Sequence, residues 1–201
     1  MVRQFVRIAA ILALGAAAVQ ADTWNVDKAH TSIGFSVKHL VISTIHGNFT
    51  DFDGTVEWDG KDLAAASIGV TIQSKSITTN QERRDGHLRS NDFFAVDSFP
   101  TLTFKSTKVV KGEGDNFQVT GDLTMRGRTH PVTLNGTFGG TVTDQRGSVH
   151  AGFSAEGTIN RQDFGVSYSA TLDNGGLVVG NDVKIQLEVE LVKPSPEAPK
   201  K

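Results

Sequence analysis

TNQERRDGHLRSNDFFAVDSFPTLTFKS, from Thr79 to Ser106, interrupts a chain in which most other segments alternate apolar and polar residues. A period of two is typical of strands that bury one face, so the strand pattern changes here. Residues 80–89 contain no proline and no β-branched residue, and we predict one short helix near residues 80–90. Leu88 is its only large apolar residue, so the helix cannot build a core of its own. We expect it to close one end of a sheet or barrel through Leu88 and polar contacts.

The start of this helix is predicted from a capping box. Thr79 and Glu82 have the required spacing, because the Thr79 hydroxyl can accept from the Glu82 N–H while the Glu82 side chain reaches back. Asp85 and Arg89 are four residues apart with the acid first, an order that favours an ion pair along a helix. The sequence thus predicts a helix capped by Thr79 and supported by one internal ion pair.

The composition limits both the fold and the function. A length of 201 residues suits one domain with a core, and 21 glycines suit many tight turns. The formal net charge of -2 gives no electrostatic footprint for nucleic acid, so no nucleic-acid partner is expected. The absence of cysteine excludes disulfides, thiol catalysis and cysteine-ligated metals.

The first 21 residues have the organisation of a cleaved signal peptide. Arg3 and Arg7 form a positive segment, and Ile8–Ala18 form an apolar run that is too short to span a bilayer. We expect residues 1–21 to be removed and the protein to be exported to a bacterial periplasm. The folded domain is then expected over residues 22–193, followed by a Pro-rich, charged and disordered tail over residues 194–201.

The mature chain reads as a series of strands with one apolar face each. The cleanest alternation is near the end, where aliphatic residues from Val183 to Leu191 are separated by polar ones. Short spacings and turn signals such as Asp59-Gly60 favour an all-β fold of about eight antiparallel strands. The pattern leaves two architectures open: a sandwich filled by its own side chains, and a closed barrel that can hold one small ligand.

Motifs with recognisable chemistry are few. The six histidines form no HxH or HExxH pattern, so we expect no metal site. No GxSxG elbow is present to expose a serine, and we name no catalytic residue. The segment from Arg83 to Asp92 is dense in charge. It is either a polar ring that meets a ligand head group or a solvated helix face with structural ion pairs.

Five stretches of the chain resemble the YceI-like family of lipid-binding proteins. They are VDKAHTSIGFSVKHLVIS (26–43), RRDGHLRSNDFFAVDSFPTLTFKST (83–107), GDLTMRGRTHPVTL (121–134), GFSAEGTINRQDFGVSY (152–168) and GNDVKIQLEVELVK (180–193). They occur in the family's order and cover nearly all of the mature chain. The agreement of several long motifs makes the resemblance specific.

The resemblance implies a lipocalin-like antiparallel β-barrel that holds an amphiphile. The expected function is that of an exported carrier for a long-chain isoprenoid, either a polyisoprenoid or an isoprenoid quinone, or a related lipid. The resemblance implies no cofactor. It does imply transient contact with a membrane and the formation of homodimers. The candidate ligand-binding residues are Phe35, Val37, His39, Phe49, Ile68, Val70, Leu88, Phe104, Leu123 and Phe153. An ordinary filled core remains the alternative for each of them, because small barrels can fill themselves.

Two other function classes remain open. A lipid-modifying enzyme could use His87 or His39 with Asp85, although the sequence shows no nucleophile at a diagnostic spacing from these residues. A periplasmic, stress-related protein-binding module would be favoured by a large exposed apolar patch.

Overall fold

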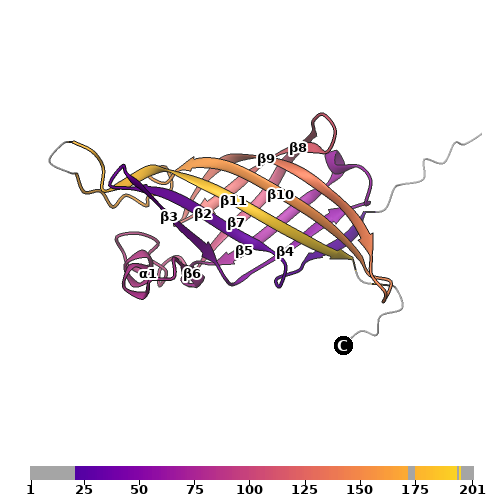
Figure 1. Ribbon diagram of the computed structural model, residues 1–201, viewed down its shortest axis with the longest axis horizontal. Coiled ribbons are helices and arrows are strands. Elements are labelled where there is room, and N and C mark those ends of the chain that lie inside the picture. Colours follow the sequence, from indigo (N-terminus) through magenta and orange to yellow (C-terminus); the bar gives the residue numbers. More distant parts are fainter. Residues whose placement is uncertain (1–20, 172–174, 194, 196–201) are drawn as a thin grey trace, which may run out of the picture.

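The strands close into one antiparallel barrel (Figure 1). The computed structural model describes residues 21–171, 175–193 and 195. The strands in these ranges are β1 (Asp22–Val26), β2 (Ser32–His39), β3 (Ser43–Phe49), β4 (Phe52–Trp58), β5 (Ser67–Gln73), β6 (Ile77–Thr78), β7 (Thr101–Lys111), β8 (Asn116–Met125), β9 (Arg128–Thr143), β10 (Val149–Asn160) and β11 (Val179–Lys193). The helices are α1 (Glu82–Arg89) and two 3₁₀ turns, Leu63–Ala65 and Ser74–Ser76.

The strands occupy eight positions around the barrel, because three positions are each shared by two successive strands. β1 and β2 pair with different parts of β11. On the next position, β4 pairs with β1 and β3 pairs with β2. On the position after that, β5 pairs with β4 and β6 pairs with β3. The strands from β7 to β11 continue as an antiparallel meander. Pairing of Val26 with Leu191 joins β1 to β11 and closes the ring. The predicted all-β barrel of about eight strands is therefore confirmed, and the sandwich alternative is excluded.

The predicted signal peptide lies outside the described residues except for Ala21, and the predicted tail does so except for Ser195. In the described part of the chain, no helix has the length and apolar character needed to cross a membrane.

The alternation of side chains along the strands gives the barrel an apolar interior and a polar exterior. In β4 every second residue, from Phe52 to Trp58, is buried, and the residues between them are exposed. β8 repeats the same pattern from Phe117 to Met125. Because successive side chains of a strand point to opposite faces, this period of two places one apolar set inside the closed sheet.

Inward phenylalanine rings lie over glycines of the neighbouring strands. Phe35 is paired with Gly47, and Phe117 is paired with Gly136. A Cβ at Gly47 or Gly136 would lie 2.4 or 2.3 Å from the Cζ atom of the facing ring. Each ring therefore takes the space that a side chain on the next strand would fill, the arrangement known for aromatic residues that cover strand glycines. Rings held against the wall leave room in the middle of the barrel.

A chain of hydrogen bonds, completed by one longer contact between His30 and Glu190, crosses the outer wall beside the β1–β11 pairing. His30 Nδ1 lies 2.9 Å from Asp27 Oδ2 and 4.0 Å from Glu190 Oε1. His150 lies between Glu190 and Asp144, with Nδ1 2.7 Å from Glu190 Oε1 and Nε2 3.3 Å from Asp144 Oδ2. The hydrogen bonds to Glu190 and Asp144 raise the pKa of His150 against the opposing effect of burial. These contacts tie β10 and β11 to the connection between β1 and β2.

Gly136→Ala should destabilise the protein by about 1–3 kcal/mol, because the added methyl group would force the Phe117 ring out of its place. Gly69→Ala is the matched control, since nothing lies within 4 Å of a Cβ at that strand position. Urea denaturation of both variants measures the difference. Equal stabilities would show that the ring does not need the glycine.

His150→Gln should remove part of the pH dependence of stability. A histidine whose pKa is raised on folding stabilises the native state below its unfolded pKa of about 6.5, and this contribution is lost as the pH rises through the folded pKa. The stability difference between the parent and His150→Gln should thus be largest near pH 5.5 and should shrink towards pH 8. Urea midpoints measured across this range test the prediction, and a difference independent of pH would contradict it.

Candidate ligand-binding site

An apolar cavity of about 290 Å³ lies inside the barrel, and we call it the bore. Aromatic and aliphatic side chains from all around the barrel line it, together with Thr31, Gly34 and Arg161. Nine of the ten predicted ligand-binding residues are on its lining: Phe35, Val37, Phe49, Ile68, Val70, Leu88, Phe104, Leu123 and Phe153. The tenth, His39, lines a separate pocket at one end of the barrel. Contact of these residues with a ligand stays a prediction.

Two tryptophans form the closed end of the bore. Trp24 and Trp58 are 1% and 2% exposed, and their ring centroids lie 5.1 Å apart. Trp24 Nε1 donates to the Trp58 carbonyl over 3.0 Å, while the Trp58 ring packs edge-on against Phe138 and Phe153 at 5.8 Å. These rings form a packed aromatic floor at this end of the bore.

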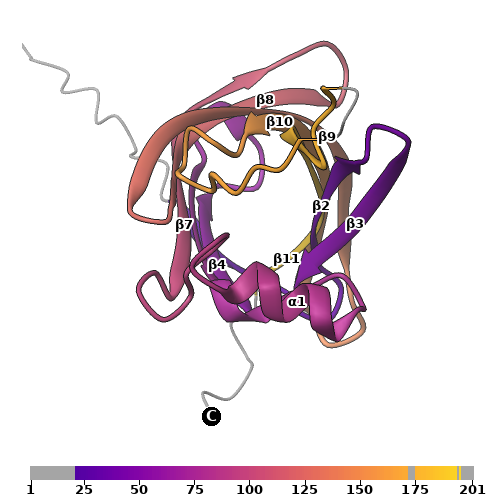
Figure 2. The ribbon, with the colours of Figure 1, turned by 90° about the vertical axis from the view of Figure 1, so that its left-hand side faces the viewer.

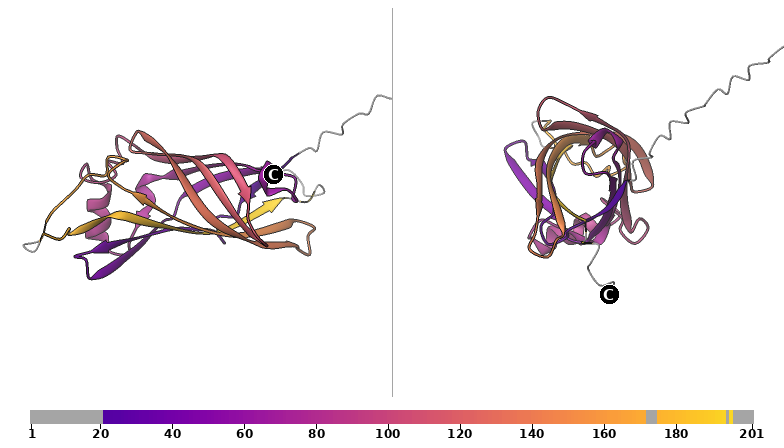
Figure 3. Two further views of the ribbon diagram at one scale, coloured as in Figure 1. Left: turned by 90° about the horizontal axis from the view of Figure 1, so that it is seen from above. Right: turned by 90° about the vertical axis from the view of Figure 1, so that its right-hand side faces the viewer.

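The opposite end is framed by α1 and the segment that follows β10 (Figure 2). Leu88 of α1 lines the bore, as predicted. His87 packs edge-on against Phe93 and Tyr168, which are tilted against each other, and the three centroid separations are 4.9–5.1 Å. This cluster connects α1 to the segment after β10, so the helix closes part of one barrel end. In the right-hand view of Figure 3, from the other end, α1 lies on the far side of the barrel.

A pocket of about 590 Å³ adjoins the bore at this end, and we call it the vestibule. Phe35, Val37, Leu88, Phe93 and Val179 line both spaces. The basic side chains on the vestibule are Lys38, His39, Arg83, Arg84 and His87, and no acidic residue occurs among the described residues that line it. The mouth of an apolar bore is therefore cationic.

The helix begins later than predicted, and its cap is a different residue. α1 starts at Glu82, and Gln81 is the N-cap, with its Oε1 accepting from the Arg84 N–H at 2.5 Å. Asn80 has a φ of 58°, a left-handed conformation that separates Thr79 from the helix. The predicted Thr79–Glu82 capping box is therefore wrong.

Thr79 instead binds the side chain of Asp85. The Thr79 hydroxyl donates to Asp85 Oδ1, and the Thr79 N–H donates to the same oxygen at 2.8 Å. The Thr78 hydroxyl donates to Asp85 Oδ2 at 2.8 Å. Burial alone would raise the pKa of Asp85, which is 4% exposed, but these hydrogen bonds outweigh it and the pKa is lowered. Asp85 is thus a buried carboxylate that fastens α1 to the end of β6.

Arg89 attaches the other end of the helix to the same edge. Its Nε donates to the Lys75 carbonyl at 2.8 Å, and its Nη2 donates to the Ile77 carbonyl at 2.9 Å. Asp85 and Arg89 do not make the predicted ion-pair contact, because both side chains hold α1 against the 3₁₀ turn and β6. The charge of Arg89 still helps to lower the pKa of Asp85. Polar contacts rather than an apolar face therefore position this helix, as its composition predicts.

Arg161 is a site residue that sequence reasoning missed. It is 4% exposed and lines the bore, and it donates to the carbonyls of Val166, Val179 and Gly180 over 2.5–3.2 Å. Its Nη2 also donates to Asn181 Oδ1 at 3.1 Å. Burial lowers the pKa of this guanidinium. Arg161 joins the turn after β10 to the start of β11, a role that no local pattern could have revealed.

The residues of the hypothesised enzyme do not come together. His87 Nε2 is 2.8 Å from Asp92 Oδ2, and neither His87 nor His39 is hydrogen-bonded to Asp85 in the described part of the chain. His39 lies on the vestibule. The hypothesised pairing of His87 or His39 with Asp85 is therefore not found among the described residues, and the acid bonded to His87 is Asp92.

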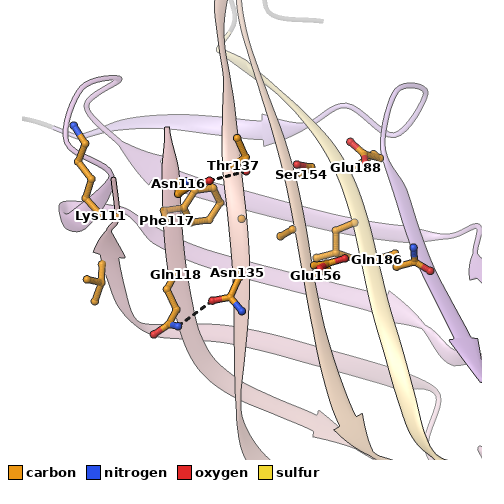
Figure 4. A pocket seen from close by; sticks show the side chains of 15 residues that line it. Lys111, Asn116, Phe117, Gln118, Asn135, Thr137, Ser154, Glu156, Gln186 and Glu188 are labelled. Carbon is orange, nitrogen blue, oxygen red and sulfur yellow. Dashed lines mark hydrogen bonds between the residues drawn. The ribbon is translucent and has the colours of Figure 1, made fainter. Parts of the chain in front are cut away.

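A third hollow, of about 640 Å³, lies on the outer wall over β7–β11 (Figure 4). Gln118 donates to Asn135 at 3.0 Å, and Thr137 donates to Asn116 at 3.1 Å along its lining. Glu156 is among its other outward residues. Its lining mixes polar and apolar residues, whereas the lining of the bore is almost entirely apolar.

Comparison with known proteins identifies the family. Residues 24–191 match the family model described as the YceI-like domain. The chain belongs to the YceI-like family. Protein YceI of Salmonella newport (strain SL254) is 43% identical to it over 162 residues, which are 80% of this chain and 84% of that protein.

Solved structures share the fold of this YceI-like protein. A crystal structure of the Campylobacter jejuni YceI protein is 34% identical, with a TM-score of 0.68 over 84% of this chain and 96% of that chain. A polyisoprenoid binding domain from Saccharophagus degradans has a TM-score of 0.59 at 14% identity, over 85% of this chain and 98% of that chain. The second similarity concerns the fold alone.

Asp85→Asn should destabilise this YceI-like protein by about 2–4 kcal/mol at pH 7, because it removes charge-assisted hydrogen bonds from buried partners. A carboxyl whose pKa is lowered on folding stabilises above its unfolded pKa, and the contribution is lost as the pH falls through the folded pKa. The deficit of Asp85→Asn should therefore shrink below about pH 4. Asp97→Asn, at an exposed position beyond the helix, is the control. Denaturation curves at pH 7 and pH 3 measure both variants, and equal stability of Asp85→Asn and the parent at pH 7 would contradict the role of Asp85.

Proposed function

We propose that this YceI-like protein carries a long-chain amphiphile, with its chain in the bore and its polar head in the vestibule. The observation that carries the proposal is the apolar lining of a cavity inside a closed barrel. Such a site favours an apolar chain, because each buried methylene contributes about 0.8 kcal/mol without any polar contact. A volume near the lower end of the usual range for ligand pockets suits a slender chain.

The vestibule supports a ligand with a polar end. Lys38, Arg83 and Arg84 lie on its lining and can donate hydrogen bonds to oxygen atoms of a head group. An apolar bore that leads to a cationic mouth is complementary to a molecule with a long apolar chain and an oxygen-containing head group at one end. We propose a long-chain isoprenoid, either a polyisoprenoid or an isoprenoid quinone, as the ligand class. The polyisoprenoid binding domain of Saccharophagus degradans, which shares the fold, supports this choice.

The proposed setting is the bacterial periplasm. Arg3, Arg7 and the apolar run Ile8–Ala18 have the pattern of an export signal. A carrier there would meet membranes transiently, and homodimers belong to the same proposal. The family resemblance is what supports the dimer.

Ala155→Phe tests the proposal by filling the bore. Ala155 lines the cavity, whereas Ser154 precedes it on β10 and points to the outer face, so Ser154→Phe adds the same ring outside. We expect Ala155→Phe to weaken binding of geranylgeraniol by tenfold or more and Ser154→Phe to leave it within about twofold. Quenching of the intrinsic tryptophan fluorescence provides the signal, because Trp58 lines the bore.

The controls separate binding from folding and from catalysis. Denaturation curves of the ligand-free variants show whether the added ring simply unfolds the protein. Organic extraction of the purified protein, followed by mass spectrometry, shows whether a lipid is carried unaltered. If both variants bind geranylgeraniol as the parent does, or if both lose binding equally, the bore is not the binding site. A chemically altered lipid would favour the enzyme, and the absence of any lipid binding would favour a protein-binding module.

A further inference from the structure

An exposed aliphatic pair projects at the same end of the barrel as the vestibule. Val41 and Ile42 are 62% and 84% exposed, and they lie in the three-residue turn that joins His39 of β2 to Ser43 of β3. We call this pair the tip. The β2–β3 hairpin extends at the end of the barrel that carries α1 (Figures 1 and 2). Two adjacent β-branched side chains are thus exposed to water at this end of the free protein.

The backbone of this turn gives a second reason to ask what the tip meets. Leu40 has a φ of 52° and Val41 a φ of 67°, and both are in the left-handed region. Glycine or asparagine is favoured there, and a β-branched residue is a rare exception. A valine at this position is therefore unfavourable for the backbone and unfavourable for its exposed side chain. Contact of the tip with an apolar phase would offset the exposure of the side chain, and asparagine at this position would suit the backbone better.

The charges beside the tip indicate which apolar phase fits. Lys38 is exposed on β2 near the turn, and its Nζ donates to Thr44 across the hairpin at 3.1 Å. Lys38, Arg83 and Arg84 line the vestibule without an acidic residue among its described lining. Aliphatic side chains flanked by cationic ones suit the boundary of an anionic bilayer, where acyl chains lie below phosphate groups.

We propose that the tip inserts into the interface of an anionic lipid bilayer and turns the mouth of the bore towards the membrane. Val41 and Ile42 then lie among the acyl chains, and Lys38, Arg83 and Arg84 face the phosphate groups. An apolar ligand could pass between bilayer and bore without crossing bulk water. This inference rests on the proposed carrier function, and it adds where on the molecule the membrane is met.

The experiment compares variants at the two ends of the barrel. Val41→Asn with Ile42→Ser removes the apolar tip, and asparagine suits the left-handed backbone, so this double variant should fold at least as well as the parent. Val142→Ser is the matched control, because Val142 is 65% exposed on β9 near the opposite end. Flotation with vesicles of phosphatidylcholine containing 30% phosphatidylglycerol, and with pure phosphatidylcholine vesicles, measures association of each ligand-free protein.

We expect the parent to bind the anionic vesicles more tightly than the neutral ones. The double tip variant should lose tenfold or more of that partitioning, since each aliphatic side chain taken from water contributes roughly one such factor. Val142→Ser should partition as the parent does. Transfer of geranylgeraniol between vesicles should slow by a similar factor in the tip variant, while its affinity for geranylgeraniol in solution should be unchanged.

Several results would overturn the inference. They are failure of the parent to bind vesicles, equal binding by the tip variant, and an equal loss in Val142→Ser. A dimer that the tip variant loses, without vesicle binding by the parent, would mean that a second copy of the chain covers the tip. Absence of geranylgeraniol affinity in solution, with vesicle binding intact, would remove the carrier function and leave the membrane contact standing.

Discussion

Closure of the sheet between β1 and β11 is the constraint on which the rest of the structure depends. An open sheet would leave unpaired N–H and C=O groups at two edges and one apolar face uncovered. β11 avoids both by pairing with β10 along one side and with β2 and then β1 along the other. The connection between β1 and β2 must therefore bend, and the chain of hydrogen bonds around Glu190 lies at this bend. Once the ring is closed, inward side chains have only one another, or a ligand, to pack against.

The interior is left partly empty because of how its largest residues are placed. Phe35 and Phe117 lie over Gly47 and Gly136 of the adjacent strands, so the rings cover the wall instead of crossing the lumen. Trp58 closes one end with the help of Trp24. Eight strand positions enclose a space just wide enough for side chains or one small ligand. Because the rings cover the wall, the interior is not completely filled by side chains and a cavity remains.

The two ends of the barrel differ in chemistry, and that difference gives the molecule a direction. One end is a floor of aromatic rings, whereas the other is built from a polar helix held by Asp85 and Arg89. Because these two side chains attach α1, Arg83 and Arg84 remain on the vestibule lining. In the charge-dense segment, Asp85 has a structural role, and Arg84 also donates to the Thr79 hydroxyl and carbonyl. Arg83 and Arg84 line a space next to the bore, and contact of this segment with a ligand head group stays a prediction. An amphiphile in such a site can have only one orientation of lowest free energy.

The sequence by itself determined the all-β class, the approximate number of strands, the inward face and the presence of a short helix at a barrel end. Each follows from local pattern: a period of two, turn residues, and a segment without β-branched residues or an apolar stripe. Eight of the ten candidate residues are strand residues on the bore, and alternation is consistent with their inward face, whereas Leu88 reaches the bore from α1. Tertiary structure decided the partners of Thr79, the role of Arg161 and the depth of the cavity. Those depend on contacts between residues distant in sequence, such as Arg161 with the start of β11, and on the separation of facing walls. Local pattern carries no information about either, because the distance across a barrel is set by how its strands close.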